Sequence, residues 1–288
     1  MAMGIAELVP GVSGGTIAFV TGIYEEFIES INRVNFSTFK TLQKEGFKMF
    51  WQQINGNFLA ALFLGMLISI VSLSSLLKWL FEFHTIAIWA FFFGLVLASI
   101  LIVGKEIKRW KPLEIILLII SASLAYFITT LPPSANADSL PYLFMSGAIA
   151  ICAMILPGIS GSFILVLLGS YKTVIDAVDE RDFRVLITVA FGCLVGLLSF
   201  ARLLKWMFNK HKNITLVILT GFIAGSLNKI WPWKATIGTL KFGDKVKRIE
   251  ESVSPFNFDG NPQLVYAIIA AVFGFSLIFI LERVATKK

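Results

Sequence analysis

The chain has 288 residues, of which 57% are hydrophobic and only 15% are charged, and its formal net charge is +7. Soluble proteins carry roughly 25% charged residues, so this composition excludes an ordinary soluble enzyme or binding domain. Several apolar runs approach the roughly 20 residues needed to cross a bilayer, which predicts an all-α polytopic membrane protein. Basic residues gather in loops and at helix ends, as in membrane proteins generally, so we expect no nucleic-acid partner.

The chain opens with two short apolar pieces, residues 1–9 and 16–27, on either side of a break. The break reads Val9-Pro10-Gly11-Val12-Ser13-Gly14-Gly15. Pro removes a backbone donor and Gly adopts angles that other residues avoid, so a membrane helix should end here. Each piece spans only about half of the ~30 Å hydrocarbon core, which favours a re-entrant hairpin over a single broken span. The sequence begins inside this element, so we expect its first half-helix to be incomplete.

A polar segment, residues 30–56, follows the first broken element. Its mixture of Phe, Trp and Lys is typical of amphipathic segments at the membrane interface, and a solvated loop is the alternative. Further on, residues 104–112 carry four basic residues, whereas residues 131–141 carry none. Since cytoplasmic loops are enriched in Lys and Arg, we expect the former in the cytoplasm and the latter outside. The three spans of this half lie at about 57–81, 86–104 and 113–131.

A second break interrupts residues 141–177, an otherwise largely apolar stretch. It reads Leu156-Pro157-Gly158-Ile159-Ser160-Gly161-Ser162, which repeats the pattern of the first break 147 residues later. A break that recurs at matching positions in two halves of a chain is the best sequence indication of a transporter's binding site. Chance accounts for one such loop but poorly for two in register.

The spans repeat as well, so the chain divides into a first repeat, residues 1–131, and a second repeat, residues 141–288. The run Leu77-Lys78-Trp79 recurs as Leu204-Lys205-Trp206, 127 residues later. Each repeat therefore holds one broken element and three spans. The spans of the second repeat lie at about 184–208, 213–231 and 263–281.

The relative orientation of the repeats depends on whether the broken elements cross the membrane. Re-entrant elements give three crossings per repeat and inverted repeats, but they place the basic loop 232–262 outside. Crossing elements give parallel repeats and place the basic turn 202–212 outside. Long loops follow the charge rule poorly, which favours the first arrangement. We therefore expect two inverted repeats, each a re-entrant hairpin followed by three transmembrane helices.

The two breaks are the candidate binding site. A helix that starts after Pro-Gly-x-Ser-Gly presents free backbone N–H groups, and the serines add hydroxyl donors, a combination that suits an anion and especially a phosphate. Two such tips meeting near the bilayer midplane would form one site, and the alternative is that the tips only satisfy each other's backbone groups. The candidate residues are Pro10, Gly11, Ser13, Gly14, Gly15, Thr16, Pro157, Gly158, Ser160, Gly161 and Ser162.

Two charged residues lie in apolar surroundings. Glu7 precedes Pro10 by three residues, and an ionisable group at this depth is a candidate for H⁺ or Na⁺ coupling, with a carboxylate near the interface as the alternative. Arg202 lies in a span, where it could pair with a phosphate or with Glu7. Snorkelling of the Arg202 side chain to the headgroups is the competing interpretation.

The remaining polar and reactive residues indicate no catalysis. Tyr24 and Tyr171 stand where helices leave the tips, and we expect them in the aromatic belt at the interface. Cys152 and Cys193 lie in apolar segments and are typical of buried small side chains. No ligand spacing for a metal is present, so we expect neither a metal site nor a cofactor.

The two breaks resemble those of a bacterial family, the PopT-type polyprenyl-phosphate translocases. The resemblance is carried by Pro10-Gly11-Val12-Ser13-Gly14-Gly15-Thr16 with Gly22-Ile23-Tyr24-Glu25, and by Leu156-Pro157-Gly158-Ile159-Ser160-Gly161-Ser162 with Gly169-Ser170-Tyr171. It implies a multi-pass protein of the cytoplasmic membrane that returns undecaprenyl phosphate from the outer to the inner leaflet. It also implies inverted repeats with re-entrant hairpins and dependence on an ion gradient.

Other functions remain as alternatives to lipid translocation. Undecaprenyl-pyrophosphate phosphatases resemble this chain in their re-entrant Pro-Gly-x-Ser tips, but an Arg follows the Ser there, whereas Gly14 and Gly161 stand at those positions here. Transport of another small anion fits the tips equally well. A membrane scaffold without transport activity is the third alternative.

Overall fold

The computed structural model describes residues 1–8, 13–131, 139–242 and 245–286. Within these ranges four helices are long and apolar enough to cross a membrane, and a bent pair of shorter helices raises the number to five if it forms one span. The chain is therefore a helical multi-pass membrane protein. The long helices are α6 (Gly56–Phe83), α7 (Thr85–Glu106), α8 (Pro112–Thr130) and α12 (Phe183–Ser226), and α13 (Leu264–Thr286) is a further apolar helix.

A corner at a histidine divides the long helices in both halves of the chain. His84 (φ −133°, ψ 40°) separates α6 from α7, and His211 (φ −136°, ψ 46°) interrupts α12. Each histidine ring packs edge-on against a preceding tryptophan, Trp79 at 5.1 Å and Trp206 at 5.6 Å. The same local sequence thus forms the same corner twice. α12 continues into a short 3-10 helix, η1 (Leu227–Ile230).

The last long helix of each half packs on the middle helix of the other half. α13 lies along α7, and α8 lies along the second part of α12. Glycines bring these backbones together: a Cβ on Gly94 would lie 1.9 Å from the Ala271 carbonyl oxygen, and one on Gly221 would lie 2.0 Å from Ser121 Oγ. Small residues let membrane helices approach closely enough for dispersion forces to hold them.

The two broken elements are short helices that flank the breaks. The first contains α1 (Ala2–Glu7) and α2 (Gly14–Val20), and the second contains α9 (Leu140–Ile155), α10 (Gly161–Leu167) and α11 (Tyr171–Asp179). α10 and α11 are bent by 107° to each other. α1 packs on α6 and α9 packs on α12, so each broken element lies against the long helix that follows it.

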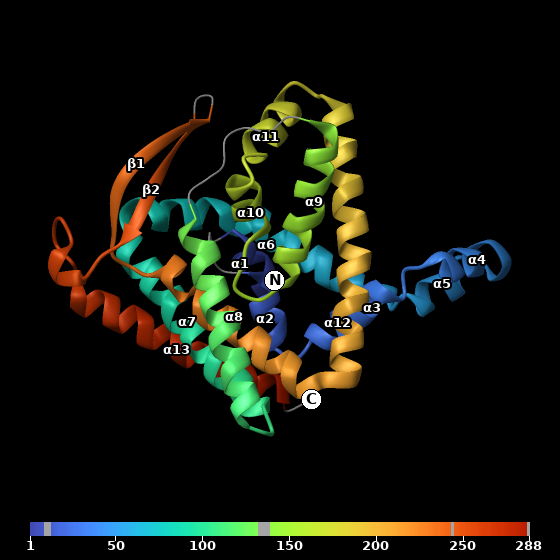
Figure 1. Ribbon diagram of the computed structural model, residues 1–288, viewed down its shortest axis with the longest axis horizontal. Coiled ribbons are helices and arrows are strands. Elements are labelled where there is room, and N and C mark those ends of the chain that lie inside the picture. Colours follow the sequence, from blue (N-terminus) through green and yellow to red (C-terminus); the bar gives the residue numbers. More distant parts are fainter. Residues whose placement is uncertain (9–12, 132–138, 243–244, 287–288) are drawn as a thin grey trace.

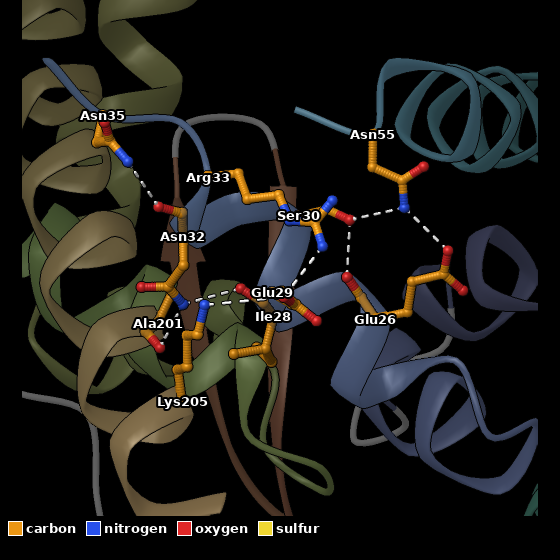
Figure 2. Close-up of polar contacts among 10 residues, drawn as sticks. All are labelled: Glu26, Ile28, Glu29, Ser30, Asn32, Arg33, Asn35, Asn55, Ala201 and Lys205. Atoms are coloured by element: carbon orange, nitrogen blue, oxygen red, sulfur yellow. Dashed lines mark hydrogen bonds and ion pairs between the residues drawn. The ribbon is translucent and has the colours of Figure 1, made fainter. Parts of the chain in front are cut away.

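Helix α3 (Tyr24–Asn32) ties the first broken element to the second half of the chain, as Figure 2 shows. Asn32 Nδ2 donates to the Ala201 carbonyl on α12 at 2.7 Å. On its other side, Asn55 Nδ2 at the start of α6 donates to Glu26 Oε1 at 2.9 Å. These bonds hold α3, which follows α2 after a short turn, between α12 and the start of α6.

The segment after α3 forms two helices, α4 (Phe36–Glu45) and α5 (Phe47–Gln53), which project sideways from the helical bundle (Figure 1). Phe47 is 64% exposed and its ring packs on Trp51. An exposed aromatic pair on a lysine-bearing helix supports the prediction that this segment lies at the membrane interface.

Residues 232–262 contain an antiparallel hairpin, β1 (Lys234–Phe242) and β2 (Lys245–Ser252), and a short 3-10 helix, η2 (Pro255–Asn257). The sequence predicted only a long loop here, so the all-α class holds for the membrane part alone. Two tryptophans hold the hairpin in place: Trp231 Nε1 donates to the Val253 carbonyl at 2.8 Å, and Trp233 Nε1 donates to the Pro262 carbonyl at 2.9 Å.

The close approach of α7 and α13 gives a test of the packing. Gly94→Ala places a methyl group against the Ala271 backbone, so we expect the free energy of unfolding to fall by about 1–3 kcal/mol. Gly104 is on the same helix with nothing within 4 Å of its Cβ position, and Gly104→Ala serves as the matched control. Thermal unfolding of the purified protein in detergent measures both. Equal melting temperatures for the two variants would contradict the packing.

Candidate functional site

The first break lies directly against the end of α9. Ser13 Oγ donates to the Met154 carbonyl at 3.1 Å and accepts a hydrogen bond from the Gly15 N–H at 3.0 Å. The Tyr24 hydroxyl donates to the Ile155 carbonyl, also at 3.1 Å. The two predicted tips therefore meet. Pro10 and Gly11 lie outside the described residues.

These contacts supply hydrogen-bond donors to the carbonyls at the end of α9. Met154 and Ile155 are the last residues of α9, so their carbonyls have no donor further along the helix. In a membrane, an unsatisfied carbonyl costs several kcal/mol, and only protein groups can supply a donor. Ser13 and Tyr24 supply it, so part of the chemistry of the first tip is structural, as the alternative interpretation of the tips expected.

Gly15 makes the close contact between the tips feasible. A Cβ at this position would lie 2.6 Å from the Ile155 carbonyl oxygen. At the second tip, Gly158 has φ +92°, and a Cβ there would lie 2.7 Å from Ser226 Oγ on α12. Glycine is required at Gly158 both by its backbone angle and by this contact.

The serines of the second tip are placed differently from Ser13. Ser160 precedes α10 but forms no side-chain capping bond. Its Oγ lies 2.9 Å from Ser162 Oγ, and the Ser162 side chain is exposed. Among the described residues these two hydroxyls bond only each other, so they retain lone pairs and a proton for a ligand. Ser160 and Ser162 are thus the more available donors of the two tips.

Thr16 stands out on the first tip. Its side chain is fully buried, and its Oγ1 has no hydrogen-bond partner among the described residues. A buried hydroxyl without a partner costs free energy, and native structures keep few of them. Thr16 is therefore a candidate donor to a bound ligand.

Glu7 reaches across the first broken element. Its Oε1 accepts a hydrogen bond from the Gly14 N–H at 2.9 Å. A Cβ on Gly14 would lie 2.6 Å from that same oxygen, so only glycine admits the carboxylate. The carboxylate occupies a backbone donor that sequence analysis assigned to an anionic ligand.

Arg202 is not gathered with the tip residues. Its side chain is exposed on α12, and it forms no ion pair within the described part of the chain. Its neighbour Ala201 bonds Asn32 of α3, which places Arg202 beside α3. Its role in binding phosphate stays a prediction.

The sequence interpretation of Tyr24 was wrong. Its side chain is only 2% exposed and packs edge-on against Phe19 and Phe208, at 5.0 and 5.9 Å between ring centroids. It is a structural donor at the tip and not part of an aromatic belt. One signal could have found it: Tyr24 and Tyr171 share the spacing of the two breaks, whereas belt residues need no such register.

Comparisons with known proteins agree on one family. Residues 3–245 match the family described as VCA0040-like, undecaprenyl phosphate translocase-like. A polyprenyl-phosphate transporter of Vibrio cholerae is 43% identical over 293 residues, covering 100% of this chain and 95% of the relative. One of Staphylococcus aureus is 33% identical over 249 residues, covering 80% and 83%. No solved structure matches the chain.

The unequal surroundings of the two serines predict unequal costs of removing them. Ser13→Ala breaks two hydrogen bonds and leaves the Met154 carbonyl unsatisfied, so we expect a loss of about 1–3 kcal/mol in unfolding free energy. Ser160→Ala removes an exposed contact and should stay within about 0.5 kcal/mol of the parent protein. Denaturation of both variants in the same detergent provides the measurement. Equal losses would mean that Ser13 does not bridge the tips.

Proposed function

The chain belongs to the undecaprenyl phosphate translocase-like family, and we propose that it moves undecaprenyl phosphate from the outer to the inner leaflet of the bacterial cytoplasmic membrane. It is a transporter and not an enzyme. Both relatives are named for polyprenyl phosphate, which is a lipid with an anionic head and a long apolar tail. Returning this carrier lipid to the cytoplasmic side would recycle it for synthesis of the cell envelope.

The direction of the long helices supports inverted repeats. α7 and α13 run parallel: Ile86 packs with Ala267 near their starts, and Lys105 Nζ lies 5.2 Å from the Phe279 ring centroid near their ends. α8 follows α7 after a turn of a few residues, so it runs back in the opposite direction.

α8 is in turn parallel to the second part of α12. The backbone contacts advance together along both helices, from Gly221 against Leu118 to Gly225 against Ala122. The second part of α12 therefore runs opposite to α7, which is its counterpart in the first repeat. Counterparts that point in opposite directions are what two inverted repeats require, and transporters of this kind bind substrate where the repeats meet.

The observation that carries the proposed site is the meeting of the two tips at Ser13 and Met154. Beside this contact stand the unpartnered Thr16 hydroxyl and the Gly14 N–H. The Ser160 and Ser162 hydroxyls belong to the second tip. A phosphate head offers several strong acceptor oxygens, and charge-assisted hydrogen bonds to such donors are short and strong.

Glu7 provides a means of coupling transport to a proton gradient. Its carboxylate holds the Gly14 N–H that a phosphate would use, so the two anions compete for one donor. When the phosphate takes the donor, the released carboxylate lies in apolar surroundings, where an unpaired charge is costly. Uptake of a proton by Glu7 removes that cost. Phosphate binding and protonation of Glu7 would therefore favour each other.

The hydroxyl donors can be tested in cells through the lipid itself. In Thr16→Val/Ser160→Ala we expect undecaprenyl phosphate to accumulate on the outer surface, with a transport rate reduced at least about tenfold, equivalent to roughly 1.4 kcal/mol. Protein stability should hold, because among the described residues Thr16 Oγ1 has no partner and Ser160 Oγ bonds only the neighbouring Ser162 Oγ. A probe that binds the exposed phosphate head measures the accumulation.

Thr16→Ser keeps the hydroxyl and is the matched control for this experiment. If exposure of the lipid is unchanged in the double variant while protein levels hold, the tips do not bind its phosphate. Uptake of soluble phosphate or sulfate by the same variants would then decide whether the chain carries a small anion instead.

The coupling role of Glu7 has a separate test. Gln retains an oxygen that accepts from the Gly14 N–H but cannot take up a proton at neutral pH. In proteoliposomes we expect Glu7→Gln to transport slowly and without response to an imposed pH gradient, while the parent protein responds. A sodium gradient applied in parallel identifies the ion. An unchanged response to pH in Glu7→Gln would remove Glu7 from the coupling mechanism.

A further inference from the structure

Lys229, on η1, lies against helix α10 of the second broken element. Its Nζ lies 4.5 Å from the ring centroid of Phe163, in the first turn of α10. The Lys229 side chain is partly buried, and within the described residues it forms no ion pair. Removing an ammonium from water without a carboxylate partner is costly, and the ring face compensates by about 0.5–2 kcal/mol only. Such a residue in a membrane protein is a functional candidate.

The place of Lys229 connects it to the tip. Three residues before it, Ser226 fits against Gly158, whose Cβ would lie 2.7 Å from Ser226 Oγ. Phe163 lies on the other side of the break, in α10. The end of α12 and η1 therefore contact the second broken element within its break, at Gly158, and just after it, at Phe163. An anion bound by Lys229 would lie beside the second tip.

Lys229 faces the side of the membrane that carries the hairpin β1–β2. Lys234 Nζ, on β1, donates to the Lys229 carbonyl at 2.5 Å and lies 4.2 Å from the Trp89 ring centroid, near the start of α7. The basic turn between α7 and α8 lies at the other end of α7, where Asn213 Nδ2 bonds the Arg109 carbonyl at 2.9 Å. Since short basic turns are cytoplasmic, Lys229 lies on the outer side.

Of the two neighbouring lysines, Lys229 is the one left for a ligand. Lys234 is engaged by a carbonyl and an aromatic ring. Burial lowers the pKa of both ammonium groups, that of Lys234 to about 8. Lys234 lines a pocket of about 410 Å³ that also contains Glu250 and Asp259, whose negative charges disfavour an anion there. The negative charge of Glu250 raises the pKa of both lysines, which partly offsets the effect of burial. Among the described residues it forms an ion pair with neither of them.

We propose that Lys229 binds the phosphate head of the incoming lipid beside the first turn of α10, on the outer side of the second break, before the head reaches the hydroxyl donors of the tips. This inference rests on the proposed function, since it names where the same substrate is first bound. A phosphate oxygen replaces the Phe163 ring as the partner of the ammonium, and a charge-assisted contact is the stronger of the two. The ring is then free to contact the first prenyl units of the tail.

Binding of a short-chain polyprenyl phosphate to the purified full chain in detergent tests this inference. We expect Lys229→Gln to raise the dissociation constant about tenfold, and Lys229→Arg to stay within about threefold of the parent protein. Lys210→Gln is the matched control and should bind normally. Lys210 also lies over an aromatic ring, 6.0 Å from Trp206, but it is exposed on the other part of the long helix. The fluorescence of Trp231 and Trp233 near the site offers a readout.

Three further ligands separate the outcomes. The matching polyprenol, which lacks phosphate, should bind the parent protein and Lys229→Gln alike, and inorganic phosphate should compete more weakly in Lys229→Gln than in the parent protein. If Lys229→Gln binds polyprenyl phosphate as tightly as the parent, the inference is overturned and the proposed function stands. A Lys229→Arg variant that stays folded but binds as weakly as Lys229→Gln would also overturn it.

The remaining outcomes concern the substrate. If the parent protein binds phosphatidylglycerol as tightly as polyprenyl phosphate, and both depend on Lys229, the anion site is supported while the proposed substrate is overturned. If the parent protein binds no phosphate-bearing ligand, both the inference and the proposed function fail. Melting temperatures of all variants show whether a loss of binding is a loss of folded protein.

Discussion

The structure depends on one constraint, which is that a helix broken inside a membrane must find hydrogen-bond partners within the protein. Water is absent at that depth, and an unsatisfied backbone group costs several kcal/mol. The end of α9 meets this constraint through Ser13 and Tyr24, which belong to the other repeat. The second tip therefore depends on residues of the first half of the chain. The glycine at Gly15 follows from the same constraint, because the donors must come within bonding distance of the Ile155 and Met154 carbonyls.

This dependence makes the two tips chemically different although their sequences match. The Ser13 hydroxyl donates to the Met154 carbonyl, whereas among the described residues the Ser160 hydroxyl bonds only Ser162, whose side chain is exposed. The Glu7 carboxylate accepts a hydrogen bond from the Gly14 N–H at the first tip. At the second tip, Met154 occupies the position that matches Glu7 and supplies no carboxylate. In the proposed mechanism, the first tip therefore holds the second in place and carries the titratable group. The second tip supplies hydroxyl donors to the ligand.

Much of the fold follows from the sequence because its signals are local. Apolar runs locate the long helices, and Pro-Gly locates the breaks, since both effects act within a few residues. The repeat spacing indicates which elements are counterparts. The packing of α8 on α12 and of α13 on α7, each in the other half of the chain, could not be predicted. It depends on contacts such as Gly94 with Ala271 that no local pattern encodes. Inverted repeats remain an interpretation of these directions.

Residues whose role depends on distant neighbours were missed for the same reason. The sequence of hairpin β1–β2 is basic and interrupted by glycine, so it predicts a loop. The bonds of Trp231 and Trp233 that hold the hairpin in place are visible only in the structure. Tyr24 has the composition of an interfacial residue, and only its contact with Ile155 shows otherwise. Lys229 looks like a snorkelling residue at the end of a span. What distinguishes it is that no carboxylate of the described residues lies within ion-pair distance of its ammonium, which only three-dimensional packing reveals.

The distribution of charge bears on how such a carrier could release what it binds. At the corner near His211, basic residues have acidic partners: Lys212 pairs with Glu25 at 2.6 Å and Lys205 with Glu29 at 3.9 Å. These exposed pairs stabilise the fold little, but each carboxylate reduces the attraction of its lysine for another anion. On the side of β1–β2, no carboxylate of the described residues lies at ion-pair distance from Lys229. Under the proposed function, a phosphate is therefore attracted more strongly by Lys229 than by Lys205 or Lys212, so the paired lysines hinder its release less.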